Sequence, residues 1–183
     1  YISVTDTIKE DTAEGLKALK DIGVTDLVML TGDNRETAEK VAEQAGITEV
    51  HANLLPEDKV AIAEQILDKG RIAAFVGDGV NDAPVLARVD AGIAMGGLGS
   101  AAAMEAADVV IMDDNPKKIS LAIRIGRKTV RLAKENIWFA LIIKLLVLVL
   151  GALGLVNMWA AVFADVGVAV IAIANSMRAL RVK

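Results

Sequence analysis

Residues 72–84 read Ile-Ala-Ala-Phe-Val-Gly-Asp-Gly-Val-Asn-Asp-Ala-Pro, and this stretch decides the fold. Its first part is a short apolar run without polar alternation, which predicts a buried strand of a parallel sheet. Its second part follows at once and consists of glycines, carboxylates and an amide. Functional groups in parallel sheets gather on the loops that follow the strands. We therefore predict that residues 77–84 form a functional loop at the carboxyl edge of a sheet.

The rest of residues 1–115 repeats this alternation of strand and helix. Further apolar runs occupy residues 27–30, 91–95 and 109–112, with a shorter one at 50–52. Amphipathic patterns between them predict helices at 12–22, 34–45 and 56–69. Such alternation is typical of an α/β domain with a parallel sheet that is covered on both faces. Two more polar loops, Thr31-Gly32-Asp33-Asn34 and Pro56-Glu57-Asp58-Lys59, are then expected at the same edge.

The loop at 77–84 has the composition of a hard-cation site. Asp78 and Asp82 supply carboxylates and Asn81 supplies an amide on one short turn. These oxygen ligands are the type that Mg²⁺ takes in proteins. The alternative is a solvated turn followed by a helix cap. We disfavour it because many of the side chains in residues 77–84 would serve no packing purpose there.

The two other loops are suited to an anion. Thr31, Gly32 and Asp33 offer a hydroxyl and a backbone N–H near a helix N-terminus, which suits a phosphoryl oxygen, although a helix cap by Asp33 or Asn34 would explain them too. Lys59 lies in a first helical turn, where the helix dipole disfavours a cation, so we expect an anionic partner or else a solvated amine. A hydroxyl, a lysine and Mg²⁺-binding carboxylates form the set that phosphoryl transfer needs. The sequence lacks the Gly-x-x-x-x-Gly-Lys-[Ser/Thr] loop of P-loop proteins.

Composition narrows the class of protein. The chain has 183 residues, of which 54% are apolar and 3% aromatic, and it has no cysteine. Thiolate metal sites, disulfides and cysteine nucleophiles are thereby excluded within it. Few aromatic residues and a net charge of −4 argue against a nucleic-acid partner. The chain begins at Tyr1 with no visible signal peptide, and we interpret it as part of a longer protein.

The charge and the apolar content divide the chain near Asn136. Residues 1–136 hold 16 basic and 23 acidic residues, a net charge of −7. Residues 137–183 hold 4 basic residues and 1 acidic residue, a net charge of +3, so the whole chain carries −4. Residues 137–156 contain one charge, Lys144, and residues 158–177 contain one acid, Asp165. Segments of about 20 apolar residues span a bilayer, so we predict a transmembrane hairpin at 137–183. The alternative, two buried helices of a soluble protein, needs a much larger core.

Basic residues on both flanks of this hairpin predict its orientation. They place residues 1–136 and the C-terminus in the cytoplasm. We expect a connecting helix at 116–136, started by Pro116, whose basic face either rests on anionic lipid or is solvated. Counted from Asn157, Lys144 lies about 19 Å deep and Asp165 about 12 Å deep, close enough to pair. Either the pair only locks the hairpin, or Asp165 is an ion ligand with Lys144 as a fixed positive charge. The flanking residues are Arg124, Arg127, Lys128, Arg131 and Lys134 before the hairpin and Arg178, Arg181 and Lys183 after it.

Residues 29–34, 56–59 and 77–84 resemble, in order and spacing, the phosphorylation domain of P-type ATPases, within the haloacid dehalogenase-like fold. The resemblance implies that Thr31 binds the phosphoryl group, Lys59 neutralises it, and Asp78 binds Mg²⁺ with Asp82. It also implies ATP as cofactor. The implied catalytic residues are Thr31, Gly32, Asp33, Lys59, Asn81 and Asp82.

The hairpin is similar to the last two helices of the zinc/cadmium/lead class of these ATPases. The similarity rests on Asn136, Lys144, residues 164–167, Asn175 and Arg178. It implies that Asp165 and Lys144 belong to a transport site for a divalent soft metal ion. It further implies export by a multi-pass protein of the cell membrane, with the lipid bilayer, the metal ion and an N-terminal part of the same polypeptide as partners.

One departure from the family bears on activity. The family's nucleophile is the Asp of an Asp-Lys-Thr-Gly motif on an upstream strand, and this chain contains no such motif. We therefore expect residues 1–115 to be the C-terminal half of a phosphorylation domain that is inactive alone. Two alternatives stay open: a membrane-anchored phosphatase of the same fold, and a truncated, non-catalytic regulator.

Overall fold

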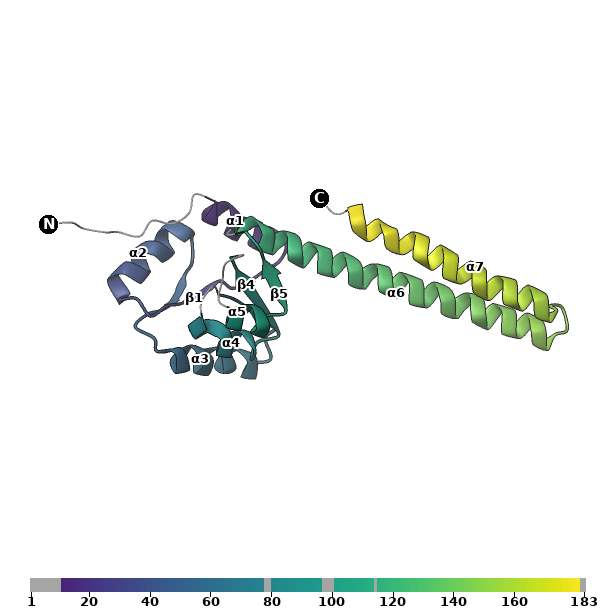
Figure 1. Ribbon diagram of the computed structural model, residues 1–183, viewed down its shortest axis with the longest axis horizontal. Coiled ribbons are helices and arrows are strands. Elements are labelled where there is room, and N and C mark those ends of the chain that lie inside the picture. The colour runs from purple at the N-terminus through teal and green to yellow at the C-terminus, as the bar shows by residue number, and fades with distance from the viewer. Residues whose placement is uncertain (1–10, 78–79, 97–100, 114, 182–183) are drawn as a thin grey trace. The chain divides into compact units, whose positions relative to one another are not determined.

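The computed structural model describes residues 11–77, 80–96, 101–113 and 115–181. The chain divides into two compact units, residues 1–120 and residues 121–183. The first unit contains the strands and the short helices, and the second consists of two long helices (Figure 1).

The described strands of the first unit are all parallel, as predicted. They form two sheets, β1–β2 and β3–β4–β5, instead of the single sheet that the alternation suggested. In the first sheet Met29 lies opposite Val50, and in the second Val76 lies opposite Ile93. Within the described residues, β1 and β3 therefore each keep one edge free of strand pairing. The strands are β1 (Val28–Leu30), β2 (Glu49–His51), β3 (Ala74–Gly77), β4 (Ala91–Met95) and β5 (Val109–Ile111).

The helices of the first unit begin where the sequence predicts them. The side chain of Asn34 caps α2 by accepting the N–H of Thr37 at 2.9 Å, and Pro56 occupies the first position of α3. The Asp58 carboxylate adds a bond from the N–H of Leu55, 2.9 Å away. The predicted helices are α1 (Thr12–Asp21), α2 (Arg35–Ala45) and α3 (Pro56–Asp68); shorter elements follow at η1 (Val80–Asp82), α4 (Ala83–Leu86) and α5 (Ala101–Ala106).

Helices α4 and α5 cover one face of the three-stranded sheet. Leu86 of α4, Ala94 of β4 and Ala103 of α5 form a buried cluster at this contact. Two glycines allow the close approach: a Cβ at Gly92 would lie 2.5 Å from the backbone oxygen of Leu86, and one at Gly77 would lie 2.8 Å from the Asp82 carboxylate. The backbone at Leu86 and the Asp82 side chain thereby lie close against β4 and the end of β3.

The start of α6 is fixed to α1 within the first unit. A Cβ at Gly15 would lie 3.0 Å from Pro116, so helix and chain pack closely there. The amine of Lys117 contacts the carboxylates of Asp11 and Glu14 at 2.6 Å each. Hydrogen bonds that the Lys117 amine donates to Asp11 and then to Glu14 raise the pKa of Lys117 well above its usual range.

The second unit is a helical hairpin. Helix α6 (Lys117–Ala152) begins directly after Pro116 and is continuous, so the expected connecting helix and first span are one element. It ends four residues before the predicted limit, since Gly154 adopts a φ of 71° and the Leu155 N–H bonds to the Leu150 oxygen at 2.9 Å. Helix α7 (Met158–Ser176) follows, with η2 (Met177–Arg181) at its end.

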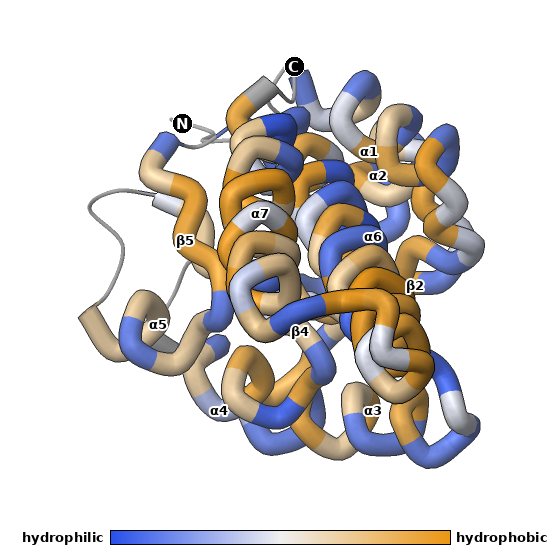
Figure 2. Tube along the Cα trace, turned by 90° about the vertical axis from the view of Figure 1, so that its right-hand side faces the viewer, coloured by the Kyte–Doolittle hydropathy of each residue, from blue (hydrophilic) through white to orange (hydrophobic). Residues whose placement is uncertain are grey.

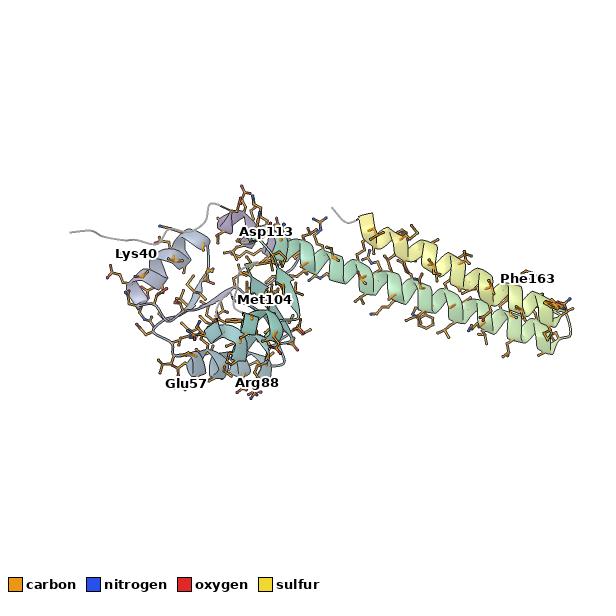
Figure 3. All side chains as sticks on the ribbon, in the orientation of Figure 1. Lys40, Glu57, Arg88, Met104, Asp113 and Phe163 are labelled. Carbon is orange, nitrogen blue, oxygen red and sulfur yellow. The ribbon has the colours of Figure 1, made fainter. Side chains whose placement is uncertain are left out.

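Both helices of the hairpin are long and apolar enough to cross a bilayer. Their most apolar windows have mean hydropathies of 2.0 and 1.8. Most residues of α7 are apolar, and much of its tube is orange in Figure 2; Val168 is its one buried residue. Side chains project outward along both helices, Phe163 of α7 among them (Figure 3). This distribution is that of helices whose outer faces meet lipid or other apolar helices.

Candidate functional site

The loop after β1 forms a compact turn around Thr31. The Thr31 hydroxyl donates to Asp33 Oδ2 at 2.9 Å, and the Asp33 N–H donates back to the Thr31 Oγ1 at 3.1 Å. Backbone bonds from Asn53 to Asp33 (2.8 Å) and from Leu54 to Thr31 (3.0 Å) fasten this turn to the segment after β2. A Cβ at Gly32 would lie 3.3 Å from the Leu54 oxygen, so a small residue suits that position. The turn presents a hydroxyl and a carboxylate at the end of a strand.

The anionic partner expected for Lys59 is the carboxylate of Asp82. The Lys59 amine lies 2.8 Å from Asp82 Oδ1, and the two side chains are only 16% and 12% exposed. Lys59 comes from the first turn of α3 and Asp82 from the end of η1, so the pair joins the loop after β2 to the loop after β3. The carboxyl ends of the two sheets therefore meet at this ion pair.

The loop after β3 also contains the predicted site residues Asn81 and Asp78. Asn81 lies in η1 with its side chain exposed, and Asp82 precedes α4 without capping it through its side chain. Asp78, the implied Mg²⁺ ligand, lies outside the described residues. The structure therefore brings together Thr31 with Asp33, and Lys59 with Asp82.

The donor set at this edge is compatible with Mg²⁺. Asp82 is buried, and the absence of a side chain at Gly77 makes room for its Oδ2. Mg²⁺ is usually held by one or two carboxylates, with water and phosphate completing its shell. Among the described residues, no group of three or more acidic, histidine or cysteine side chains gathers into a metal cluster. A site that uses one or two carboxylates fits this arrangement.

The hairpin holds the second predicted pair. Lys144 Nζ of α6 lies 3.1 Å from Asp165 Oδ1 of α7. Both line a cavity of about 470 Å³ between the two helices, together with apolar residues that include Val147 and Val168. The pair joins two apolar helices and is exposed on the hairpin, with its side chains 64% and 62% accessible. Charged groups on apolar helices of this kind are costly in a membrane and commonly mark an ion pathway.

A polar network at the other end of the hairpin was given no role by the sequence. Asn175 donates to Asn136 Oδ1 at 2.8 Å, and Asn136 donates to the Ser176 hydroxyl at 2.9 Å. Arg178 donates to Asn175 Oδ1 at 2.9 Å and lies 3.5 Å from Glu135. The sequence does show amide side chains at the ends of its apolar segments, which indicates polar residues suited to such a network. It does not show that Asn136 and Asn175 pair, because that depends on how the two helices face one another.

Comparisons with known proteins agree with this geometry. A family model described as haloacid dehalogenase-like hydrolase matches residues 1–90. A cadmium, zinc and cobalt-transporting ATPase of Bacillus subtilis is 54% identical over 100% of this chain and 26% of its own length. A zinc-transporting ATPase of Synechocystis is 54% identical over 97% of this chain and 25% of its length. The solved structure of a zinc-transporting PIB-type ATPase in the E2.Pi state matches with a TM-score of 0.89 and 38% identity, over 96% of this chain and 28% of that one.

The parallel strands, their polar carboxyl ends and the family model place the first unit in the haloacid dehalogenase-like class of α/β folds. Over 96–100% of its length, which includes the two apolar helices, the chain is homologous to part of zinc- and cadmium-transporting ATPases, one of them a PIB-type ATPase of known structure. It spans about a quarter of the length of the curated relatives that it matches.

Proposed function

We propose that this chain is part of an ATP-driven exporter of divalent soft metal ions such as Zn²⁺, Cd²⁺ or Pb²⁺, working through an aspartyl-phosphate. The observation that carries the proposal is the Lys144–Asp165 pair, 3.1 Å apart within two apolar helices. A membrane-anchored phosphatase needs no such pair. The names of the relatives, which are zinc- and cadmium-transporting ATPases, support the same reaction.

In this proposal the first unit is the part of the phosphorylation domain that binds the phosphoryl group. The Thr31 hydroxyl and the backbone N–H groups of Gly32 and Asp33 bind the phosphoryl oxygens. To do so, the Thr31 hydroxyl gives up its hydrogen bond to the Asp33 carboxylate and donates to a phosphoryl oxygen instead. Lys59 supplies positive charge, and its pairing with Asp82 keeps the amine oriented before the phosphoryl group arrives. Asn81 and Asp82 organise the loop. This division assigns residues 1–115 to the phosphorylation domain, 116–136 to a connecting helix and 137–183 to the membrane.

Asp78 and Asp82 would hold Mg²⁺ in this scheme. The ion supplies neutralising charge for phosphoryl transfer when bound. Asp82 is well placed for such a role because its buried carboxylate is already oriented by Lys59. ATP itself would be bound mainly by segments of the polypeptide outside this chain.

The free strand edges support an upstream source for the phosphorylated aspartate. β1 and β3 each have one unpaired edge among the described residues, and Val76 of β3 is 40% exposed. Parallel strands are usually buried on both faces, so these edges are suited to a further strand. We infer that a strand carrying the Asp-Lys-Thr-Gly motif joins them, and that it comes from an N-terminal part of the same polypeptide.

The hairpin would carry part of the transport site. Asp165 acts as an oxygen ligand, and Lys144 acts as a fixed positive charge that occupies the site when the metal ion leaves. The relatives are membrane ATPases and both helices are long and apolar enough to span a bilayer. We further propose a multi-pass protein of the cell membrane with residues 1–136 and the C-terminus in the cytoplasm, as the basic flanks indicate.

Metal binding to the polypeptide completed by its upstream part tests the transport site. Asp165→Ala should lose measurable Zn²⁺ or Cd²⁺ affinity in equilibrium binding to the detergent-purified protein. Lys144→Ala should keep binding but change turnover, because it removes no ligand. Glu43→Ala is the control, since it removes an exposed carboxylate of the first unit that lies outside the hairpin. If Asp165→Ala binds Zn²⁺ as tightly as the unmodified protein, the transport site is elsewhere.

A second experiment tests the phosphorylation site independently of the metal site. Asp78→Asn should abolish phosphorylation by ATP in the completed polypeptide, because a neutral amide is a poor Mg²⁺ ligand and leaves the phosphoryl charge uncompensated. Phosphoenzyme at the unmodified level at limiting Mg²⁺ would remove Asp78 from the site. The readout is acid-stable incorporation of phosphate.

A further inference from the structure

Helices α6 and α7 have little apolar packing to fix how they face one another. Val168 is the one buried residue of α7, and a cavity of about 470 Å³ separates parts of the two helices. In a bilayer the lipid tails are as apolar as the side chains, so no hydrophobic force selects one register over another. Apart from the short turn at 153–157 that joins the helices, the register of this hairpin therefore depends on its polar contacts.

The polar contacts between the described parts of the two helices fall at two levels. One is the Lys144–Asp165 pair, and the other is the network in which Asn175 donates to Asn136 at 2.8 Å. Asn136 also donates to the Ala172 backbone oxygen at 3.2 Å. A single paired asparagine between helices is known to specify register at some cost in stability. The asparagine network is thus able to set the register by itself.

The spacing of the two levels matches along both helices. Lys144 follows Asn136 by eight residues, about 12 Å, and Asp165 precedes Asn175 by ten, about 15 Å. At about 100° per residue, both steps turn the side chains by some 80° toward the same flank of the antiparallel pair. When the asparagines are paired, the lysine and the aspartate therefore emerge on one side of the hairpin at similar depth.

We propose that Asn136 and Asn175, supported by Ser176 and Arg178, form a polar clasp that fixes the register of α7 against α6 and so positions Asp165 beside Lys144. The functional part of this proposal rests on the proposed transport site. Arg178 donates to Asn175 Oδ1 at 2.9 Å and leaves its amide N–H for Asn136. The clasp residues touch no metal ion in this scheme; they act through the lysine–aspartate pair.

A distance measurement on the chain in lipid nanodiscs tests the register directly. The chain has no cysteine, so Leu145→Cys and Ile173→Cys supply two unique sites for spin labels on exposed positions of α6 and α7. Asn175→Ala should shift the mean label distance by an amount between one residue of rise, about 1.5 Å, and one turn, about 5.4 Å. Asn136→Ala should give a shift at least as large, because it removes the bond to Asn175 together with the bonds to Ser176 and to the Ala172 oxygen. The double variant should add little to the shift of Asn136→Ala.

The matched control is Asn157→Ala. The Asn157 side chain accepts the Ala160 N–H at 2.8 Å and caps the other end of α7, so this variant weakens the helix without touching the clasp. It should leave the label distance unchanged. An unchanged distance in Asn175→Ala, or an equal shift in Asn157→Ala, would overturn the proposal.

Metal-stimulated turnover of the completed polypeptide tests whether the clasp acts through Lys144, whose own removal changes turnover and keeps metal binding. Asn175→Ala should lower this turnover by roughly three- to tenfold, a factor that corresponds to the free energies of interhelical hydrogen bonds in membranes. In a Lys144→Met background, Asn175→Ala should have less than about a twofold effect, since the lysine beside which the clasp positions Asp165 is gone. Equal losses in both backgrounds would indicate general destabilisation and refute the positioning role. If Asp165→Ala leaves binding intact, the proposed transport site fails, whereas the label distances still decide the clasp.

Discussion

Lys59→Met should destabilise the first unit by about 2 kcal/mol, because it leaves the Asp82 carboxylate buried without a cation. The amine and the carboxylate are 2.8 Å apart and their side chains are only 16% and 12% exposed. Removing one partner of a fully buried pair costs about 3–5 kcal/mol, and a hydrogen bond to a charged group contributes about 1.5–3 kcal/mol. Because both side chains keep some exposure, the expected loss falls below the first range and within the second, at about 2 kcal/mol.

Urea unfolding of the chain in mild detergent, followed by circular dichroism, measures this loss. With a slope of about 2 kcal/mol per molar urea, the midpoint should fall by about 1 M. The matched control is Lys40→Met, whose amine contacts Glu36 at 2.7 Å on an exposed helix face and should cost less than about 0.5 kcal/mol. Adding Asp82→Asn to Lys59→Met should recover part of the loss. Equal midpoints for Lys59→Met and Lys40→Met would refute the reasoning.

Three further outcomes follow from other contacts. Gly92→Ala should lower the free energy of unfolding by about 1–3 kcal/mol, measured by the same urea titration, because its Cβ would meet the Leu86 oxygen at 2.5 Å; Gly126→Ala, with open space around it, should not. The raised pKa of Lys117 keeps its charge, and hence the hydrogen-exchange protection factors of α1, constant from neutral pH to about pH 9; protection falls only as the pH rises further through that pKa. The purified 183-residue chain should show no Mg²⁺-dependent ATPase activity in a phosphate-release assay, since it contains no Asp-Lys-Thr-Gly motif.

Much of the fold could be predicted because local signals agree with it. Asn34 caps α2 and Pro56 opens α3, as their positions in the sequence indicate. The strand Ala91–Met95 has the predicted bounds, since a short apolar run with no alternation has few other solutions. The predicted end of the first apolar segment, residue 156, is too late because the apolar sequence continues past Ala152, whereas the backbone turns at Gly154.

The candidate site was predictable in its residues but not in its pairings. The misfit of Lys59 in a first helical turn predicted an anion, and the structure supplies Asp82, which lies 23 residues away in sequence. The division of the strands into two sheets depends on which strands pair with one another, and the sequence pattern within a strand does not specify its partner. Asn136 and Asn175 likewise acquire a partner only when two helices face each other, which a pattern within either helix cannot specify.

Among the residues that the structure describes, β1 and β3 each keep a free edge, and these edges also affect how the chain behaves during its own synthesis. An unpaired strand edge is a template for any strand of suitable register, including one from another copy of the chain. Ile72, next to β3, is 92% exposed and adds an apolar surface to that template. Produced without a covering strand, the chain should tend to self-associate. A peptide that carries the missing strand, added in trans, should compete with this association and leave more of the chain monomeric.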